Sequence, residues 1–407
     1  MLAAGPAAAM LSACGRRRAP DRLALWAQDV EGDNCRYLLP DFTVRGGGAV
    51  DLQRLAWTTA HEKLLTAFAG GSLPDVMMIA RDWVAEFATI GLLAPAPASL
   101  MADQFPDAGR AMAYRGRPWS VPWTLDTQVL FYRRDLLADA GHDRPPERLD
   151  EWRAMLRDVK RRGRAAHAIL MHLDWPEHLF TLAAQYVALP LRDGQTRGDF
   201  RSAGFRSALA FYKSLFDEGL TPIVTSTDVT DPSAELARGT FALYPSGAWQ
   251  RADLERRDLM PHDRWTVARM PGIDRAGRCV IAGAVLGVAH DAADPARAWT
   301  LVRYLTGIPA QLRLHALAGT LPSRPEAWRA GGLARDPIAA TFAAALADPA
   351  PSPSVPEWPR IRTEVQATAE RMVRGQLTLD AAVTAMDARA DALLAKRRWL
   401  LDRGRIA

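Results

Sequence analysis

The stretch KLLTAFAGGSLPDVMMIARDW, residues 63–83, predicts a helix, a strand and the start of a second helix. Its first apolar residues lie on one helical face, and a glycine pair then ends the helix. A Pro-Asp pair opens the apolar run 76–79, which has the length of a buried strand. Asp82 stands where a side chain can cap the following helix. Such alternation is typical of α/β proteins.

Outward from this unit, short apolar runs continue to alternate with helical patterns. Helices of 8–12 residues between strands predict βαβ units and a mainly parallel sheet. The further strands are expected at residues 23–26, 50–57, 241–244 and within 280–289. The later helices are expected at residues 203–218, after Pro295, and twice between 361 and 397. The segment 31–48 is a poor helix candidate, because it contains Pro40 and several glycines.

The composition is that of a soluble globular protein with two or three domains. The 407 residues are 49% hydrophobic and 24% charged, and no apolar run reaches the length of a membrane span. The 51 basic and 46 acidic residues are spread along the whole chain, which does not indicate a nucleic-acid partner. Three cysteines are too few for a disulfide framework. Cys35 and Cys279 either pair in an oxidising compartment or remain separate buried thiols.

The N-terminus has the pattern of a secretory signal. Residues 1–13 are uncharged and small or apolar, and LSAC at 11–14 looks like a bacterial lipobox ending in a lipidated Cys14. The arginines at 16–18 could then lie against anionic headgroups. No basic residue precedes the apolar stretch, so we expect the true start codon to lie upstream. The alternative is an alanine-rich start with a chance cysteine.

Known catalytic motifs are missing from the sequence. Residues 46–48 lack the third glycine of a dinucleotide-binding loop, and no GxxxxGK[ST] is present. His61-Glu62 is not followed by a second histidine one turn later, as a zinc site would need. The loop between His172 and His178 could hold a metal, but its spacing matches no common zinc pattern. We therefore expect no catalytic residues, no metal and no cofactor.

Tryptophan is present in excess: there are thirteen, many of them beside an acid, an amide or a glycine. An indole stacks on the C–H face of a pyranose, while a neighbouring carboxylate accepts hydrogen bonds from the sugar hydroxyls. The alternative is that individual tryptophans fill cores. As a group at strand ends and loops they favour a ligand cleft at the carboxyl ends of the strands. The tryptophans singled out are Trp26, Trp83, Trp123, Trp175, Trp249 and Trp358.

Five motifs in the right order resemble extracellular solute-binding protein family 1, the sugar-binding lipoproteins and periplasmic proteins that serve ABC importers. The strongest is KLLTA followed by PDV, within residues 63–76. The others are DWVAEF at 82–87, VPWTLDT at 121–127 with LFYRRDL at 130–136, FALYPSGAW at 241–249 and LPSR at 321–324. The resemblance covers nearly all of residues 21–400. It implies a periplasmic-binding-protein-like fold, in which two α/β lobes are joined by a multi-segment hinge with the cleft between them.

The resemblance also implies a set of ligand contacts. These are Gln28 or Asp29, Thr58, Asp82, Asp126, Trp249, Gly283 and Arg324, the last being equally a lobe-packing residue. The tryptophan pairing adds Trp83, Trp123 and Trp175. The chain departs from the family pattern twice. Ala284-Val285 stand where disaccharide-binding members often carry an aromatic residue, and residues 351–354 lack an arginine that many members have there.

The function that the resemblance implies involves no chemical step. The lobes close on a carbohydrate about a hinge near residues 126, 280 and 325, and the closed form docks on an ABC permease with its ATPase subunits. The implied division is 1–20 as signal and tether, 21–125 with 280–325 as the N-terminal lobe, and 126–279 with 326–407 as the C-terminal lobe. We expect an exported monomer, tethered in the periplasm or at the cell surface. Two alternatives stay open: a receptor that presents its ligand to a sensor, and a secreted glycosidase with Asp82 and Asp126 as its acids.

Overall fold

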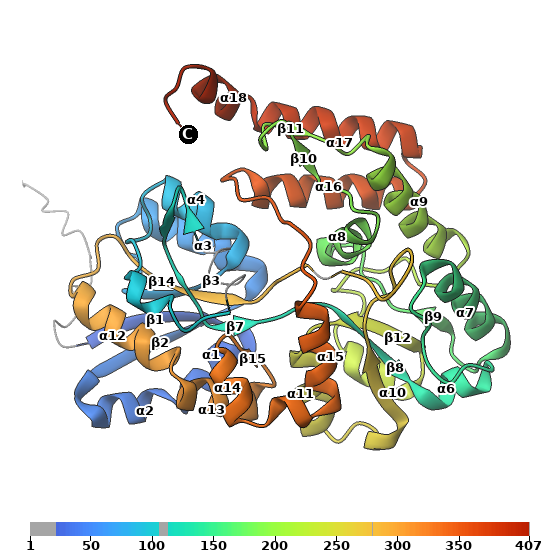
Figure 1. Ribbon diagram of the computed structural model, residues 1–407, viewed down its shortest axis with the longest axis horizontal. Coiled ribbons are helices and arrows are strands. Elements are labelled where there is room, and N and C mark those ends of the chain that lie inside the picture. Colours follow the sequence, from blue (N-terminus) through green and yellow to red (C-terminus); the bar gives the residue numbers. More distant parts are fainter. Residues whose placement is uncertain (1–21, 106–112, 279, 407) are drawn as a thin grey trace, which may run out of the picture.

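The computed structural model describes residues 22–105, 113–278 and 280–406. Two α/β lobes lie side by side and are connected by short segments (Figure 1). The N-terminal lobe carries the blue elements and part of the orange ones, which shows that it is assembled from distant parts of the chain. The predicted two-lobed α/β class is confirmed.

The N-terminal lobe is built on one five-stranded sheet. Its strands, in spatial order, are β2 (Ala49–Leu55), β1 (Arg22–Gln28), β3 (Val76–Ala80), β14 (Ala284–Val288) and β6 (Val121–Pro122). The first three are parallel, as the βαβ pattern predicts, whereas β14 runs antiparallel to both of its neighbours. The helices of this lobe are α1 (Asp29–Cys35), α2 (Leu39–Phe42), α3 (Trp57–Ala69), α4 (Val84–Thr89), α12 (Pro295–Leu305) and α13 (Ile308–Ala318). Their apolar faces form one core with the sheet.

The stretch 63–83 folds largely as the sequence predicts. The helix α3 and the strand β3 match the prediction, and the segment 31–48 is broken into short helical pieces. The expected capping role of Asp82 is wrong. Asp82 lies in a 3-10 turn, Arg81–Trp83, and α4 follows without a side-chain cap. The carboxylate of Asp82 is instead engaged by arginines, as described below.

The C-terminal lobe has a four-stranded sheet of order β13 (Trp265–Ala268), β8 (Val129–Arg133), β12 (Phe241–Ser246) and β9 (His167–Ile169). Only β12 and β9 run parallel, so the expectation of a mainly parallel sheet is wrong here. The apolar runs predict the strands correctly. They do not predict whether neighbouring strands are parallel, because neighbours in a sheet can come from distant segments of the chain. Successive residues of β8 alternate between the two cores of this lobe, one on each face of the sheet.

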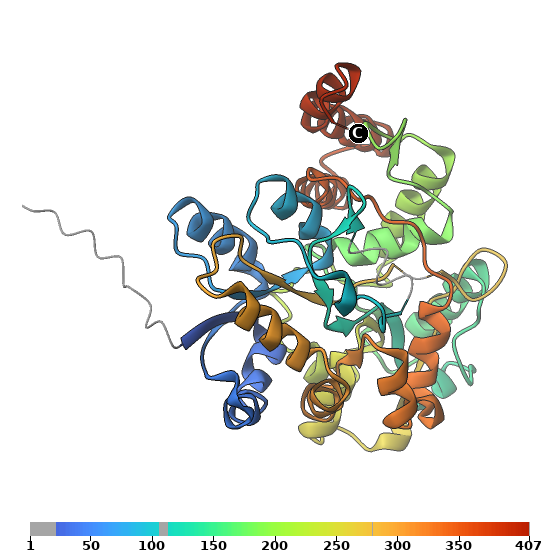
Figure 2. The ribbon, with the colours of Figure 1, turned by 60° about the vertical axis from the view of Figure 1, so that its left-hand side comes forward.

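The remaining helices pack around this second sheet or against the elements that cover it. They are α6 (Arg134–Asp139), α7 (Leu149–Arg162), α8 (Pro176–Gln185), α9 (Ala203–Asp217), α10 (Pro232–Arg238), α11 (Trp249–Arg256), α14 (Pro325–Ala330), α15 (Pro337–Leu346), α16 (Trp358–Val373), α17 (Leu379–Leu393) and α18 (Ala395–Asp402). The predicted helices at 203–218 and within 361–397 are confirmed. In a rotated view, the deep-red C-terminal helices lie at the top of the molecule (Figure 2), and both α16 and α17 contact α9. Within the described ranges, no helix is long and apolar enough to cross a membrane.

Three segments connect the lobes. The strand β7 (Thr124–Leu125) pairs antiparallel with β15 (Leu321–Pro322). Beside them, Asp126 and Ala282 exchange two backbone hydrogen bonds of 3.1 and 2.8 Å. Gly283 has φ 121°, and a Cβ at that position would lie 2.2 Å from the carbonyl oxygen of Thr124. Only glycine therefore fits where these segments cross.

Cys35 is buried in the core of the N-terminal lobe. Its potential partner Cys279 and the potential lipidation residue Cys14 lie outside the described residues. Both alternatives, pairing with Cys279 and a separate buried thiol, therefore remain predictions.

Candidate ligand-binding cleft

A cavity of about 800 Å³ lies between the two lobes. One wall is formed by the loops after β1, β2 and β3 in the N-terminal lobe. The opposite wall is formed by α8, by the start of α11, by α16 and by the proline-rich segment 350–353. The connecting segments 124–127 and 280–284 form the third side. The cavity is therefore placed where closing or opening of the lobes would change its shape.

The N-terminal wall collects acids and indoles from the carboxyl ends of parallel strands. Asp29 follows β1 directly, and its carboxylate accepts a hydrogen bond of 3.1 Å from the backbone N–H of Trp57. This bond ties the end of β1 to the first turn of α3, where Thr58 also faces the cavity. The rings of Trp57 and Trp83 meet edge to face with their centroids 5.7 Å apart. Asp82 completes this wall.

Two carboxyl groups near the connecting segments lie in an environment that disfavours their charge. Burial raises the pKa of Glu31 to about 7, and the charges of Asp126 and Asp29 add to the effect. Burial also raises the pKa of Asp126 to about 6, although backbone N–H groups oppose it. One of these is the N–H of Ala248, which donates to Asp126 Oδ1 at 2.9 Å. Carboxylates that have lost water need hydrogen-bond donors, and hydroxyl groups of a ligand would supply them.

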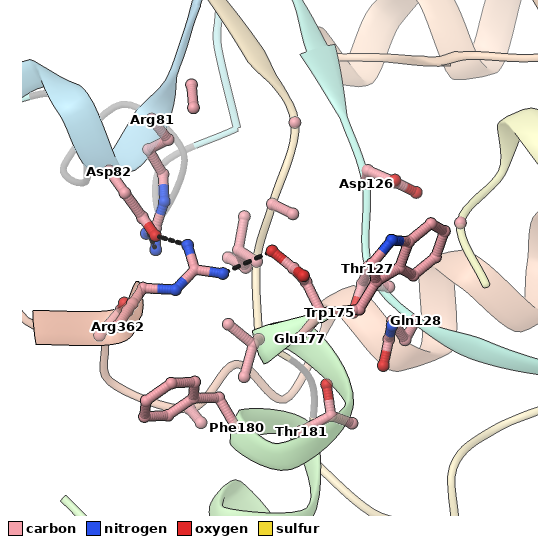
Figure 3. A pocket seen from close by; sticks show the side chains of 18 of the residues that line it. Arg81, Asp82, Asp126, Thr127, Gln128, Trp175, Glu177, Phe180, Thr181 and Arg362 are labelled. Atoms are coloured by element: carbon pink, nitrogen blue, oxygen red, sulfur yellow. Dashed lines mark hydrogen bonds and ion pairs between the residues drawn. The ribbon is translucent and has the colours of Figure 1, made fainter. Parts of the chain in front are cut away.

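Arg362 on α16 joins the two walls. Its guanidinium pairs with Asp82 of the N-terminal lobe and with Glu177 on α8 (Figure 3). Asp82 also pairs with Arg81 at 3.3 Å. Burial alone would raise the pKa of Asp82, but the charges of Arg362 and Arg81 outweigh it and hold this pKa below its ordinary value. An ion pair between the lobes therefore lies inside the cleft itself.

The C-terminal wall is aromatic. Trp175 immediately precedes α8 and Trp249 begins α11, and their rings meet edge to face with centroids 6.3 Å apart. Trp175 also packs against Tyr244 of β12 and stacks on His178, with centroid separations of 6.3 and 5.5 Å. These buried neighbours fix the orientation of Trp175, so its ring is a rigid surface rather than a mobile one.

Comparison with known proteins agrees with this geometry. A profile described as bacterial extracellular solute-binding protein matches residues 38–341. The chain belongs to this family. The solved sugar-binding protein MalE of Xanthomonas citri is 36% identical, and the match covers 94% of this chain and 99% of MalE with a TM-score of 0.83.

More distant relatives share the fold. The GacH receptor of Streptomyces glaucescens is 20% identical, with a TM-score of 0.83 over 92% of this chain and 98% of the receptor. A maltotriose-binding protein of Pyrococcus abyssi is 20% identical over 76% of this chain and 68% of its own. The family and these neighbours are binding proteins, and an extracellular family implies export.

The structure of this solute-binding protein brings most of the expected site residues to one cavity. Eight of the eleven line it: Asp29, Thr58, Asp82, Trp83, Asp126, Trp175, Trp249 and Gly283. Their contact with a ligand stays a prediction. They meet at the cavity because most of them closely follow strand ends or lie in the connecting segments.

Three expected residues lie elsewhere. Gln28 is fully buried, and its side-chain amide donates to the carbonyl of Met78 at 3.0 Å. Trp123 is also fully buried, and its indole N–H donates to the carbonyl of Leu305 at 3.1 Å. Arg324 pairs with Asp103 and does not line the cavity. The first two are core residues, and Arg324 lies beside the connecting strand β15, in keeping with the alternative role in lobe packing.

The sequence reasoning missed several cavity residues, namely Glu31, Trp57, Glu177 and Arg362. Arg362 matters most, because residues 351–354 lack the arginine that the family pattern led us to expect. The helix α16 supplies a guanidinium from the other side of the proline-rich segment. A usable signal existed: Trp358 and Arg362 are four residues apart, so both point from one face of a helix.

Metal binding finds no support in the side-chain arrangement. Within the described ranges, no three His, Cys, Asp or Glu side chains converge in a way that could hold a metal ion. His172 and His178 stack with their ring centroids 6.3 Å apart. Both are buried, and burial lowers the pKa of each ring. They are neutral core residues beneath Trp175.

Proposed function

We propose that this protein captures a carbohydrate in the cleft and delivers it to the permease of an ABC importer. The observation that carries the proposal is the pairing of aromatic faces with charged acceptors across one cavity. Trp175 and Trp249 offer flat apolar surfaces, while Asp82, Asp126 and Glu177 offer carboxylates. A pyranose needs both, because its C–H face is apolar and its rim carries hydroxyls. The names of MalE and of the maltotriose-binding relative support the same ligand class.

Closure of the lobes provides the mechanism. A sugar that touches both walls binds the closed form better than the open one, and it therefore shifts the population toward closure. The three connecting segments, near residues 126, 282 and 321, are short and paired, so they can bend together as a hinge. The permease then recognises the closed form. On this proposal the division into lobes follows the boundaries 125/126, 279/280 and 325/326.

The carboxylates fit binding better than catalysis. Asp82 is held charged between two arginines, and Asp126 is bonded to the N–H of Ala248. A glycosidase needs one carboxyl free to donate a proton to the leaving group. Because its two arginines keep Asp82 from serving as such a donor, we propose that both carboxyl groups act as hydrogen-bond acceptors.

Calorimetric titration of the full chain with mono- and disaccharides tests the carbohydrate assignment. We expect saturable binding that Trp249→Ala weakens by at least tenfold, because the stacking surface is lost. Trp399→Ala is the matched control, since Trp399 is 45% exposed on α18 and does not line the cavity. Its affinity should equal that of the wild type. Absence of binding to every carbohydrate would refute the assignment.

We propose further that Cys14 carries a lipid that tethers the exported protein. Partition of the full chain into a detergent phase after expression in a bacterium tests this. The wild type should enter the detergent phase and Cys14→Ser should stay in the aqueous phase. Equal partition of both would refute the tether and leave the binding proposal untouched.

A further inference from the structure

One part of the cavity wall carries mainly apolar side chains, although Thr181 and Ser352 also line the cavity there. We define the apolar wall as Phe180, Ala184, Val187, Leu189, Pro351 and Pro353, all of which line the cavity. It is formed by the second half of α8, by the loop that follows, and by the proline-rich segment before α16. Phe180 lies next to Arg362 in the close view of the cavity (Figure 3). The apolar wall is therefore continuous with the polar part of the cleft.

The chemistry of the apolar wall does not suit a sugar ring. None of its six side chains can donate or accept a hydrogen bond. Hydroxyls placed against it would lose water without gaining hydrogen-bond partners from these side chains, which is unfavourable. Glu177 and Arg362 lie at the Phe180 end of the apolar wall, whereas Asp29, Asp82 and Asp126 lie on the N-terminal wall and in the connecting segments. Hence the sugar belongs among them, and a different chemical group belongs against the apolar wall.

The backbone conformation at the rim of this wall also supports an apolar ligand group. Val187 has φ 53°, in the left-handed region that β-branched residues avoid. It ends α8 in the position where glycine is usual, with the N–H of Ala188 donating to the carbonyl of Ala183 at 3.1 Å. Yet Val187 is 70% exposed and Leu189 is 48% exposed, so the unfavourable conformation is not offset by burial within this chain. A strained apolar residue at the rim of a cavity is a typical mark of a functional site.

We propose that the apolar wall is a subsite for an apolar aglycone. The ligand is then a glycoside, whose sugar lies among the indoles and carboxylates and whose aryl or alkyl group lies against Val187 and Leu189. This inference rests on the proposed function, since it requires a carbohydrate in the adjoining part of the cleft. It adds that the preferred ligand carries a non-sugar group, and that Val187 and Leu189 determine this preference.

Calorimetric titration of the full chain with paired probes tests the proposal. The probes are the methyl and the 4-nitrophenyl glycosides of glucose and of maltose. For the sugar that binds, we expect the 4-nitrophenyl glycoside to bind about tenfold more tightly than the methyl glycoside, because an aromatic ring leaves water on binding. The measured quantity is the ratio of the two dissociation constants, which cancels the contribution of the sugar.

Three variants assign the effect to the apolar wall. Val187→Ser and Leu189→Ser should bring the ratio close to one by weakening the binding of the 4-nitrophenyl glycoside. Val187→Gly should do the same and also raise the melting temperature, since glycine adopts the left-handed conformation without strain. A gain in stability with a loss of preference excludes misfolding as the cause. Ile223→Ser is the control, because Ile223 is also 48% exposed but lies outside the cavity.

The outcomes separate this inference from the proposed function. Equal binding of methyl and 4-nitrophenyl glycosides would overturn the aglycone subsite and leave the carbohydrate assignment standing. A strong preference for the aryl glycoside that persists in all three variants would also overturn it, by placing the ring elsewhere. Binding of no probe, together with binding of a non-carbohydrate solute, would overturn both.

Discussion

The two walls of the cleft are built in opposite ways. The N-terminal wall consists of loops that follow three parallel strands, and its side chains are Asp29, Trp57, Thr58 and Asp82. The C-terminal wall consists of helix starts and of a proline-rich segment around a mostly antiparallel sheet. The side chains of the first wall are positioned by loops along one edge of a sheet. Those of the second wall are positioned by packing between helices that lie far apart in sequence.

This difference decides what each wall can do. A wall at parallel strand ends has its polar groups fixed by short loops, which suits hydrogen bonding to a rigid rim of hydroxyls. A wall made by α8, α11 and α16 presents larger side chains, and its shape depends on how the three helices pack. We therefore expect the first wall to determine which sugar binds. The second wall should accommodate the group that is attached to the sugar.

The largest expected effect comes from breaking the link between the walls. Arg362→Leu removes the cation that lies between Asp82 and Glu177, both partly buried, so that Asp82 keeps only Arg81 and Glu177 loses its ion-pair partner. We expect a loss of about 3 kcal/mol in the free energy of unfolding, measured by urea denaturation. Arg360→Leu on the same helix is the matched control, because Arg360 is 66% exposed and pairs only along the helix. It should change stability by less than about 0.5 kcal/mol. An equal effect of the two variants would contradict the role of Arg362 as a link.

A smaller effect is expected where the lobes are joined. Gly283→Ala places a Cβ against the carbonyl of Thr124 in a left-handed backbone conformation, so the connecting segments must shift. We expect a loss of about 2 kcal/mol in urea denaturation and weaker binding of the carbohydrate. Gly375→Ala is the control, because Gly375 also has positive φ but has open space around it. Its loss should be about 1 kcal/mol, with unchanged binding. Equal losses would show that the crossing tolerates a side chain.

The smallest expected effect is a pH dependence of the stability, which comes from Glu31 in the N-terminal lobe. The pKa of Glu31 is raised to about 7 in the folded protein, above the value of 4.5 that applies to an unperturbed group. Between these values the unfolded chain releases its proton while the folded protein keeps it. The free energy of unfolding therefore falls as the pH rises from about 4.5 to 7.

Glu31→Gln removes this titration. The variant should gain roughly 1–2 kcal/mol relative to the wild type at pH 7 and nothing at pH 4.5, as read from urea midpoints at the two pH values. Glu62→Gln, at a side chain that is 85% exposed, serves as the control and should leave the pH profile unchanged. If Glu31→Gln left the profile unchanged as well, the burial of Glu31 would not be maintained in solution.

The same contrast explains what could be predicted from the sequence. The N-terminal wall was largely predictable, because Asp29, Thr58 and Asp82 each follow an apolar run that can only be a strand, and parallel strand ends meet at one edge. Trp123 was placed wrongly because its neighbours Val121 and Asp126 fit both a core strand and a connecting segment. A residue next to an apolar strand can point into the core or into the cleft. Its direction depends on which face of the sheet the helices cover, and the sequence alone does not give this.

The C-terminal wall was predictable only in part. Trp175 and Trp249 have Asp, Gly or Pro residues close to them in the sequence, and this pattern can be recognised. Arg362 does not, because its partners Asp82 and Glu177 are 280 and 185 residues away along the chain. Long-range pairs of this kind arise from helix packing, so the spacing of Trp358 and Arg362 could place Arg362 on the face of Trp358 but could not name its partners. The direction of β8, β12 and β13 was missed for the same reason, since pairing partners come from distant segments.

The order of strands in the N-terminal sheet has a consequence for how the protein is made. The strand β14 fills the place between β3 and β6, yet it begins only at residue 284. A ribosome that has released the first 130 residues has produced every other strand of this sheet, but not the one that closes it. The growing chain must therefore wait for more than half of its synthesis before its first lobe can form. Until β14 is made, the sides of β3 and β6 that it later covers have no strand of this sheet to pair with.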